Sequence, residues 1–257
     1  PIDSVPTQPA PSQTAPDRRA REVREGNWCY LIAKWICRAF FVLVFWTKRY
    51  DPRNVPAAGA VIIASNHQSY FDPVIVGSCN RRIMQYMARD TLFRNRMFGR
   101  LIRTFNAFPV KRGATDVTAI KHSLRLLREG KALLLFPEGT RTADGRVGSA
   151  QPGVVALARR SRAPIVPVAV DGVYEAWPRG QRLPRWARFH VAYGEPLDAK
   201  MFAKLDDQQA ADRLTRAMRD LHNEVRQRAG RPPFEYADSE EPVLPPAETG
   251  QREDQGV

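Results

Sequence analysis

Cysteine is scarce in this sequence, and no metal-binding pattern is built on it. Three cysteines occur among 257 residues, with no C-x-x-C pair and no histidine spacing suited to zinc. Cys29 and Cys37 stand eight positions apart, about 12 Å along a helix, which is too far for a disulfide. The composition therefore argues against a disulfide framework and a structural metal, and it favours a reducing environment on the cytosolic side.

Acidic residues are also few, and many of them gather at one end. Lysine and arginine number 40 against 27 acids, giving a formal net charge of +13. Residues 231–257 hold seven acids against two arginines, so the remaining 230 residues carry a charge of +18. A body this basic attracts polyanions, of which nucleic acid, an anionic membrane surface and a phosphorylated substrate are all candidates.

An uninterrupted apolar run long enough to span a bilayer is missing as well. The most hydrophobic stretch, NWCYLIAKWICRAFFVLVFW at 27–46, is broken by Lys34 and Arg38. Charges near mid-helix disfavour insertion, while tryptophans suit a lipid–water interface, so we predict a membrane-associating helix over 26–50. A helix buried against the domain and a full membrane span are the alternatives.

Both ends of the chain lack the apolar side chains that a core needs. Residues 1–25 are rich in Pro, Ala, Gln, Ser and Thr, and the acidic residues 231–257 contain several prolines. We predict that both segments are disordered and that residues 51–230 form the functional domain. The chain begins with proline rather than methionine, which leaves a preceding targeting segment open.

Between these ends, short β-branched or apolar stretches alternate with helical patterns. Asp72 and Pro73 suit the cap and first position of one helix, and Asp116 and Gly130 suit the start and stop of another. The alternation predicts an α/β fold, a mostly parallel sheet flanked by helices, with functional loops at the strand ends. The predicted strands fall within 59–65, 81–89, 106–113, 131–140, 163–172 and 187–196, and the predicted helices within 72–79, 94–105, 116–130, 152–161 and 206–230. The helix at 94–105 is basic and amphipathic.

A histidine and an acid stand at the end of the first of these strands. In ASNHQSYFDPVIV, at 64–76, His67 precedes Asp72 by five residues. A histidine near its unperturbed pKa can take a proton from a hydroxyl, and a carboxylate on its other ring nitrogen fixes the tautomer. We therefore treat the two as a candidate catalytic pair, with Asp72 also capping the following helix. A polar loop residue beside a simple cap is the alternative.

A second polar cluster follows the buried strand LLLF. In LLLFPEGTRTADG, Gly139 permits the close approach of a ligand, and Arg141 offers a planar fork of donors for phosphate. We expect Glu138 to accept hydrogen bonds from a substrate hydroxyl or to hold Arg141, and a local surface ion pair is the alternative. Lys111 and Arg112 in FPVKRG add two cations after another strand, where plain surface charge is the alternative.

Four of these segments resemble the motifs of the glycerophosphate acyltransferase family, which includes bacterial 1-acyl-sn-glycerol-3-phosphate acyltransferases. NHQSYFD, FPVKRG, FPEGTR and APIVPVAV stand in the family's order and approximate spacing, within residues 28–195. The resemblance implies acyl transfer from acyl-CoA or acyl carrier protein to a glycerolipid hydroxyl, by an acyltransferase domain at 51–230 behind a membrane-associating segment. These donors are co-substrates, and the resemblance implies no cofactor and no metal.

The resemblance also assigns roles to residues. His67 matches the family's general base and Asp72 its orienting partner. The substrate-binding residues implied by the second and third motifs, whose arginines are implicated in holding the acceptor phosphate, are Lys111, Arg112, Glu138, Gly139, Thr140 and Arg141. It implies direct attack of the acceptor oxygen on the thioester, without a covalent protein intermediate.

Two departures from the family pattern concern the acceptor. Lys111 stands where many relatives have an acid, and GSAQPG stands where many have a Phe-Lys segment before the glycine at 153. The acceptor therefore stays open between lysophosphatidate, another lyso-lipid and glycerol 3-phosphate, as do the acyl-chain length and the choice between CoA and carrier protein. The compact size and short motif spacings favour lysophosphatidate, and we expect a membrane-associated protein on the cytoplasmic face of the inner membrane.

Two other classes of function fit the sequence less well. Ser65 and Ser69 flank His67, but a serine hydrolase of the G-x-S-x-G type needs an elbow that this sequence lacks. A basic protein that binds nucleic acid or a membrane surface fits the charge, yet it has no recognition motif and leaves NHQSYFD and FPEGTR unexplained. We therefore expect a lyso-lipid, an acyl thioester and an anionic membrane surface as partners, and no nucleic acid.

Overall fold

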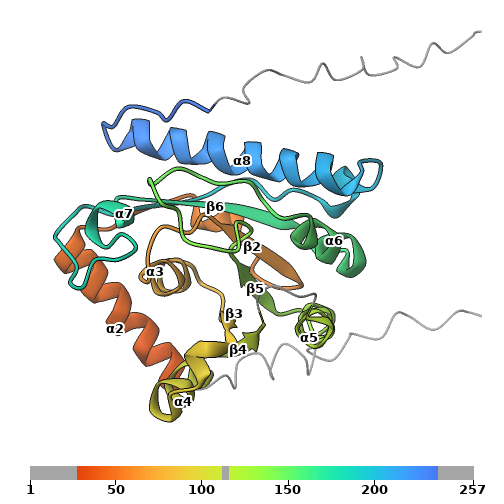
Figure 1. Ribbon diagram of the computed structural model, residues 1–257, viewed down its shortest axis with the longest axis horizontal. Coiled ribbons are helices and arrows are strands. Elements are labelled where there is room, and N and C mark those ends of the chain that lie inside the picture. Colours follow the sequence, from red (N-terminus) through yellow and green to blue (C-terminus); the bar gives the residue numbers. More distant parts are fainter. Residues whose placement is uncertain (1–27, 112–115, 237–257) are drawn as a thin grey trace, which may run out of the picture.

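A seven-stranded sheet organises the part of the chain that the computed structural model describes, residues 28–111 and 116–236 (Figure 1). Its strand order is β1-β7-β6-β2-β5-β3-β4, and the five strands from β6 to β4 are mutually parallel. β7 runs antiparallel to β6, and β1 lies parallel to β7 at the edge. The strands are Lys48–Tyr50 (β1), Val61–Ser65 (β2), Met84–Arg89 (β3), Ala107–Val110 (β4), Ala132–Leu135 (β5), Ile165–Asp171 (β6) and His190–Tyr193 (β7).

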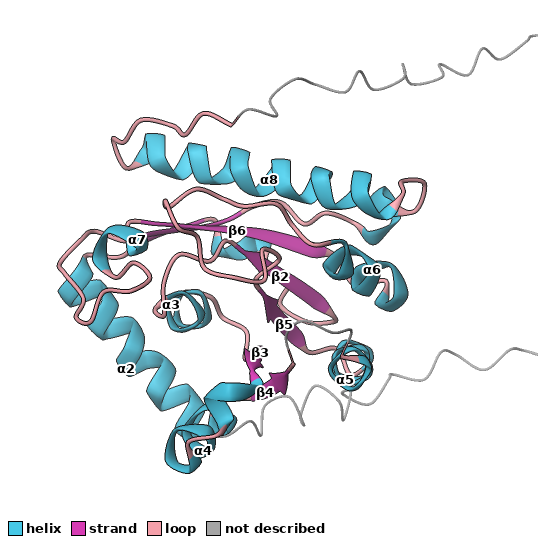
Figure 2. Cartoon of the chain, in the orientation of Figure 1, coloured by secondary structure: helices cyan, strands magenta, loops and turns pink. Residues whose placement is uncertain are grey.

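Helices cover both faces of this sheet, as Figure 2 shows, so the predicted α/β class is confirmed. Side chains of α2 and α3 pack on one face, and those of α5, α6 and α8 pack on the other. The α-helices are Trp28–Phe45 (α2), Asp72–Cys79 (α3), Arg96–Thr104 (α4), Val117–Arg128 (α5), Pro152–Ser161 (α6), Val173–Ala176 (α7) and Asp207–Arg228 (α8), and the 3-10 helices are Pro52–Asn54 (η1), Asp90–Phe93 (η2) and Ala199–Phe202 (η3).

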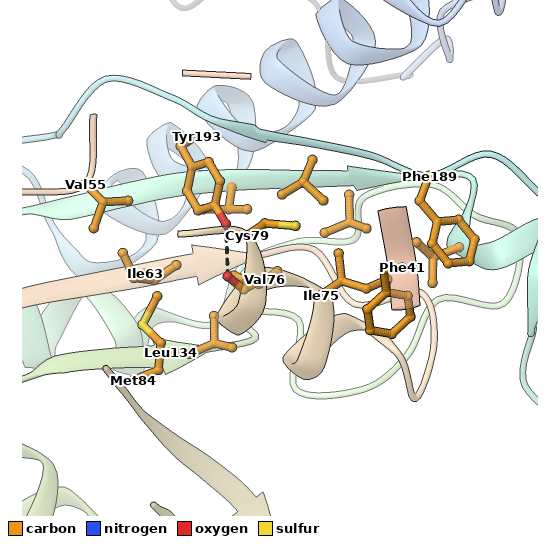
Figure 3. Packing of buried hydrophobic residues seen from close by; sticks show 14 of the residues in the cluster. Phe41, Val55, Ile63, Ile75, Val76, Cys79, Met84, Leu134, Phe189 and Tyr193 are labelled. Carbon is orange, nitrogen blue, oxygen red and sulfur yellow. Dashed lines mark hydrogen bonds between the residues drawn. The ribbon is translucent and has the colours of Figure 1, made fainter. Parts of the chain in front are cut away.

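Strand β2 shows why the sheet needs both helical layers. All five of its residues are buried. Because successive strand residues point to opposite faces, Val61 and Ile63 join the core under α2 and α3, while Ile62 and Ala64 join the core under α6 and α8. Figure 3 shows Ile63 in the first of these cores, where the Tyr193 hydroxyl also donates to the carbonyl oxygen of Val76 in α3 at 2.9 Å.

The helix boundaries follow the capping chemistry of the sequence. The Asp116 side chain accepts the Ala119 N–H at the start of α5, and Gly130, with a φ of +74°, follows the end of that helix. Asp206 and Gln209 form a reciprocal capping box at the start of α8. The helices predicted at 116–130 and 206–230 are therefore confirmed.

The N-terminal helix is shorter than the predicted segment 26–50. It ends at Phe45, and residues 48–50 form β1, which pairs with β7. Lys34, one of the two charges that interrupt the apolar stretch, turns inward and donates to the carbonyl oxygen of Arg82 at 2.7 Å. Burial lowers the pKa of Lys34 to about 8. Within the described residues, no helix combines the length and the apolar character needed to cross a membrane.

The C-terminal boundary also differs from the prediction. Residues 231–236, which we assigned to the acidic tail, lie against the domain: Arg231 bonds Asp171, and the Phe234 N–H donates to the Asn223 side chain at 2.8 Å. The Phe234 ring contacts the His222 ring and the Arg226 guanidinium, and Arg231 forms an ion pair with Asp171. These contacts hold the six residues in place, although their sequence shows no periodic pattern. The remainder of both predicted disordered segments, 1–25 and 237–257, lies outside the described residues.

Candidate active site

The candidate residues lie where parallel strands end at the same edge of the sheet. His67 follows β2, Glu138 follows β5 and Asp171 ends β6, and these three strands are neighbours. Two hydrogen bonds join the loops after β2 and β5: the Thr142 N–H donates to the His67 carbonyl oxygen at 2.7 Å, and the His67 N–H donates to the Glu138 side chain, at Oε1, over 2.9 Å. The first and third sequence motifs therefore form one structural unit.

His67 and Asp72 are in direct contact. Nδ1 of the imidazole lies 2.8 Å from Oδ2 of the carboxylate, and the ring stacks on Phe136 with a centroid distance of 4.0 Å. The His67 side chain keeps 18% of its surface exposed, whereas Asp72 is fully buried. A ring fixed on one face and at one nitrogen leaves Nε2 as the atom that can meet a ligand.

The prediction that Asp72 caps α3 is wrong. Phe71 occupies the cap position, Asp72 is the first helical residue, and no side chain caps this helix. The carboxylate turns back into the preceding loop because three donors converge there on Oδ2: His67 Nδ1, the Gln68 N–H at 2.5 Å and the Ser69 N–H at 2.8 Å. Oδ1 is buried and has no hydrogen-bond partner among the described residues.

Glu138 supports the His67 loop rather than pairing with Arg141. No ion pair joins these two side chains in the described part of the chain, so neither the expected hold on Arg141 nor the alternative surface ion pair is present. Burial raises the pKa of Glu138 to about 7, and the charge of Asp72 adds to the rise, while the N–H groups of His67 and Gly148 oppose it. The carboxyl therefore changes its charge close to neutral pH, next to the candidate base.

Arg141 lies over an aromatic ring. Its guanidinium carbon stands 3.7 Å from the ring centroid of Tyr70, and its buried Nη1 has no hydrogen-bond partner among the described residues. Gly139 adopts a φ of +69° in the turn that precedes it, a conformation that favours glycine, and both Gly139 and Thr140 are exposed. The third motif thus presents a positioned cation beside the His67 loop.

The second motif lies farther away. Lys111 is exposed after β4, which is three strands from β2, or about 14 Å at ~4.8 Å per strand. Its N–H donates to Asp116 Oδ2 at 3.0 Å. Arg112, the other residue predicted here, lies outside the described residues. Both motifs nevertheless follow strands that end at the same sheet edge.

Sequence reasoning missed a buried network behind His67. The Gln68 side chain donates to the Gly145 carbonyl oxygen at 2.9 Å, accepts the Tyr174 N–H at 3.2 Å and lies 3.4 Å from Nε2 of His222 in α8. Its partners are distant in sequence, so only the position of a glutamine directly after His67 hinted at this role. These contacts of the Gln68 side chain hold the His67 loop against α8, the start of α7 and the loop that contains Gly145.

Asp171 anchors the same network. It accepts Arg226 Nη1 at 2.9 Å and Arg231 Nη1 at 3.0 Å, and His222 Nε2 lies at 3.4 Å. Although burial raises the pKa of Asp171, the hydrogen bond from His222 and the charges of Arg231 and Arg226 outweigh it and lower the pKa. An acid at the end of a buried strand was the available sequence signal. No group of three or more His, Cys, Asp or Glu side chains suited to a metal ion occurs within the described residues.

Comparison with known proteins agrees with this architecture. The family model described as Acyltransferase matches residues 47–171. The 1-acyl-sn-glycerol-3-phosphate acyltransferase of Bacillus subtilis is 31% identical over 185 residues, which cover 70% of this chain and 90% of that protein. A protein of the same name from Streptococcus pneumoniae is 28% identical over 171 residues, covering 65% of this chain and 62% of its own.

A solved structure shares the fold. The crystal structure of the 1-acyl-sn-glycerophosphate (LPA) acyltransferase PlsC from Thermotoga maritima superposes with a TM-score of 0.66 at 21% identity, covering 85% of this chain and 88% of its own. Together with the family model, the fold defines an α/β acyltransferase domain. The chain belongs to the glycerophosphate acyltransferase family, as the four motifs predicted, and it is an O-acyltransferase.

Proposed function

We propose that this protein transfers an acyl chain from acyl-CoA or acyl carrier protein to the sn-2 hydroxyl of 1-acyl-glycerol-3-phosphate, giving phosphatidic acid for phospholipid synthesis. The observation that carries the proposal is the contact of His67 Nδ1 with Asp72 Oδ2 at 2.8 Å, which leaves Nε2 as the ring nitrogen that can accept a proton from a ligand. The names of the relatives from Bacillus subtilis and Streptococcus pneumoniae support this acceptor.

His67 acts as the general base in this proposal. Its Nδ1–H donates to Asp72, so the free lone pair sits on Nε2 and takes the proton of the acceptor hydroxyl. As the proton leaves, the oxygen attacks the carbonyl carbon of the thioester and a tetrahedral oxyanion forms. The buried carboxylate of Asp72 holds the ring in one tautomer and stabilises the imidazolium.

Collapse of the oxyanion completes the transfer. The carbon–sulfur bond breaks with its electron pair on sulfur, and the imidazolium returns its proton to the leaving thiolate. His67 is neutral again, one ester has formed, and one free thiol is released for each acyl chain transferred. This sequence needs no covalent acyl-protein intermediate, no cofactor and no metal, and its thiol product gives a direct assay.

Cations at the sheet edge bind the acceptor phosphate. Arg141 supports this step because its buried Nη1 has no hydrogen-bond partner among the described residues and its guanidinium lies over the Tyr70 ring. Lys111 follows β4 at the same edge and adds positive charge there. Arg112 lies outside the described residues, and its role is proposed from the resemblance of FPVKRG to the family motif. Glu138, Gly139 and Thr140 form the turn that carries Arg141 and supports the His67 loop.

We further propose that the enzyme works at a membrane surface on the cytoplasmic face of the inner membrane. The described outer face of α2 is apolar, with Trp28, Ile32, Trp35 and Leu43 all exposed. Tryptophan and aliphatic side chains at a helix surface suit the boundary between headgroups and acyl chains. A lyso-lipid acceptor is found at that boundary.

Thiol release from oleoyl-CoA tests the reaction, with lysophosphatidate, other lyso-lipids or glycerol 3-phosphate as acceptor. We expect thiol release with lysophosphatidate, and a loss of ~100-fold or more in kcat for His67→Ala, because general-base catalysis contributes ~10²–10⁴-fold. Circular dichroism and thermal unfolding of the variant establish that it is folded. Equal activity in the folded variant contradicts the assignment of the base, and preference for another acceptor contradicts the assignment of lysophosphatidate.

A further inference from the structure

Helix α4 has an inverted pattern of burial. Its only buried residue is Gly99, whereas Met97 is 84% exposed and Leu101 is 52% exposed. A surface helix that connects two strands normally buries its large apolar side chains and exposes small or polar ones. Here the glycine packs against the backbone of Phe93, and the large side chains point outward.

Arginines run beside these apolar side chains. Arg96, Arg100 and Arg103 fall on one stripe of α4 by their spacing of four and three residues, next to the stripe of Met97 and Leu101. All three are exposed, as is Arg94 just before the helix. Within the described part of the chain, none of these arginines has a carboxylate within ion-pair distance.

Helix α2 supplies no such charge. Its exposed residues are apolar, its two cations Lys34 and Arg38 are both partly buried, and Lys34 bonds the Arg82 carbonyl oxygen. The two helices adjoin, because Tyr30 of α2 and Phe105 directly after α4 place their rings 6.3 Å apart, and Figure 1 shows α4 at one end of α2. The apolar surface of α2 therefore adjoins the surface of α4, which is both basic and apolar.

We infer that α4 is a second membrane-docking surface and that it gives the enzyme its preference for anionic lipid, while α2 supplies insertion that is indifferent to charge. Stripes of arginine and of exposed methionine and leucine on one helix match phosphate headgroups and the acyl chains below them. The inference depends on the proposed function in one respect, that the enzyme works at a membrane surface. Lipid binding itself needs neither the acyl donor nor the acceptor.

Flotation of the full chain with vesicles tests the inference. The vesicles contain phosphatidylcholine alone, or phosphatidylcholine mixed with phosphatidylglycerol. Arg96→Gln/Arg100→Gln is expected to weaken binding to the mixed vesicles about thirty-fold, which corresponds to roughly 1 kcal/mol for each of two cations near an anionic surface. Binding to pure phosphatidylcholine is expected to change less than about twofold.

A matched variant controls for net charge. Arg160→Gln/Arg216→Gln removes two exposed arginines from α6 and α8, on the other face of the sheet, and is expected to change binding less than about threefold. Met97→Ser/Leu101→Ser is expected to weaken binding to both kinds of vesicle. Thermal unfolding identifies any variant that is misfolded. The flotation assays use no acyl donor or acceptor, so an incorrect acyl acceptor leaves their outcome unchanged.

Four results overturn the inference. Equal losses in the α4 and control pairs assign the effect to overall charge, and unchanged vesicle binding in the α4 pair removes lipid as the occupant. Unchanged vesicle binding with a raised KM for the acyl carrier protein donor alone identifies α4 as the docking site of an acidic carrier. A concentration-dependent dimer that the Met97→Ser/Leu101→Ser variant abolishes identifies a second copy of this chain as the occupant.

Discussion

At the scale of single residues, one oxygen of Asp72 organises the candidate catalytic loop. Oδ2 accepts from His67 Nδ1 and from the N–H groups of Gln68 and Ser69, so the charge that orients the imidazole also shapes the backbone that carries it. Sequence spacing predicted that His67 and Asp72 would pair, but not that the two N–H groups would draw the carboxylate away from the cap. Those donors depend on the loop conformation, which no residue pattern encodes.

Replacing Asp72 with asparagine separates these two tasks. Asp72→Asn keeps an oxygen acceptor for the two N–H groups but removes the charge that stabilises the imidazolium, so we expect kcat to fall ~100-fold or more while the protein stays folded. Steady-state kinetics and thermal unfolding check this. Asp72→Ala is the comparison, and it is expected to lower stability by ~1–3 kcal/mol because the donors lose their partner. A fully active Asp72→Asn enzyme contradicts the proposed role.

Tyr70 is expected to position Arg141 for the acceptor phosphate. The guanidinium lies 3.7 Å from the Tyr70 ring centroid, and such a contact contributes ~0.5–2 kcal/mol. We expect Tyr70→Ala to raise KM for the acceptor about three- to thirty-fold, with kcat and the donor KM within about twofold of wild type, and Tyr70→Phe to restore wild-type behaviour. Arg141→Ala, measured alongside, reports whether the guanidinium binds the acceptor at all. A Tyr70→Phe defect as large as that of Tyr70→Ala assigns the effect to the hydroxyl instead.

Glu138 makes stability depend on pH in a defined direction. Burial and the charge of Asp72 raise the pKa of Glu138 from 4.5 to about 7, so between these values the folded protein holds a proton that the unfolded chain has released. The stabilisation is fully present below pH 4.5 and is lost as pH rises toward 7. Glu138→Gln keeps an acceptor for the His67 N–H, and we expect its unfolding temperature to fall less than that of wild type over this window. Parallel pH curves for the two proteins contradict the raised pKa.

At the scale of elements, capping and periodicity predicted the main strands and helices because each signal is local. Asp116, Gly130 and Asp206 act within a few residues of themselves, which a sequence displays directly. Strand β1 was missed for the opposite reason, since three residues of mixed character gain strand structure only by pairing with β7. The packing of residues 231–236 on α8 was hidden in the same way.

Helix α3 depends on a glycine at its contact with β3. A Cβ on Gly77 would lie 2.0 Å from the Tyr86 hydroxyl, which is itself 3.1 Å from the Tyr30 hydroxyl of α2. We expect Gly77→Ala to destabilise the protein by ~1–3 kcal/mol through overpacking and to lower activity, because α3 carries Asp72. Denaturant unfolding measures the loss.

A second substitution tests the cause of that loss. Tyr86→Phe removes the oxygen that the new methyl group meets, at a cost of ~1 kcal/mol for the hydrogen bond. The double variant Gly77→Ala/Tyr86→Phe is therefore expected to lose less unfolding free energy than the two single variants lose together. If the two losses of unfolding free energy simply add, the alanine does not act through the Tyr86 hydroxyl, and this explanation is wrong.

At the scale of the whole molecule, the order and spacing of the four motifs predicted more about the protein than any single residue did. Four motifs in order predicted the family and the sheet edge where His67, Glu138 and Arg141 meet, whereas the distance of Lys111 from them follows only from the strand order. The composition showed that the protein has a positive net charge, but not where on the surface the basic side chains lie. The buried direction of Lys34 and the outward arginines of α4 depend on how helices pack, which becomes visible only in three dimensions.

The distribution of tryptophan offers a test of how the molecule lies on a membrane. Four of the five tryptophans, Trp28, Trp35, Trp46 and Trp186, are 58–78% exposed, and Trp186 joins the end of α2 by donating to the Val44 carbonyl oxygen at 2.7 Å. The fifth, Trp177, is partly buried beside Phe71. If α2 faces the lipid, most of the tryptophan fluorescence belongs to residues at the interface.

We therefore expect vesicles with brominated acyl chains to quench most of this fluorescence, and to protect it from acrylamide in the water. Trp177→Phe is the matched control, and it is expected to leave the quenched fraction nearly unchanged because Trp177 is partly buried against Phe71 rather than exposed with the other four. Replacement of Trp28 and Trp35 by phenylalanine is expected to remove much of the lipid-dependent signal while leaving membrane binding within about threefold, since phenylalanine keeps the apolar surface. Full acrylamide access in the presence of bound vesicles places α2 away from the lipid and contradicts this orientation.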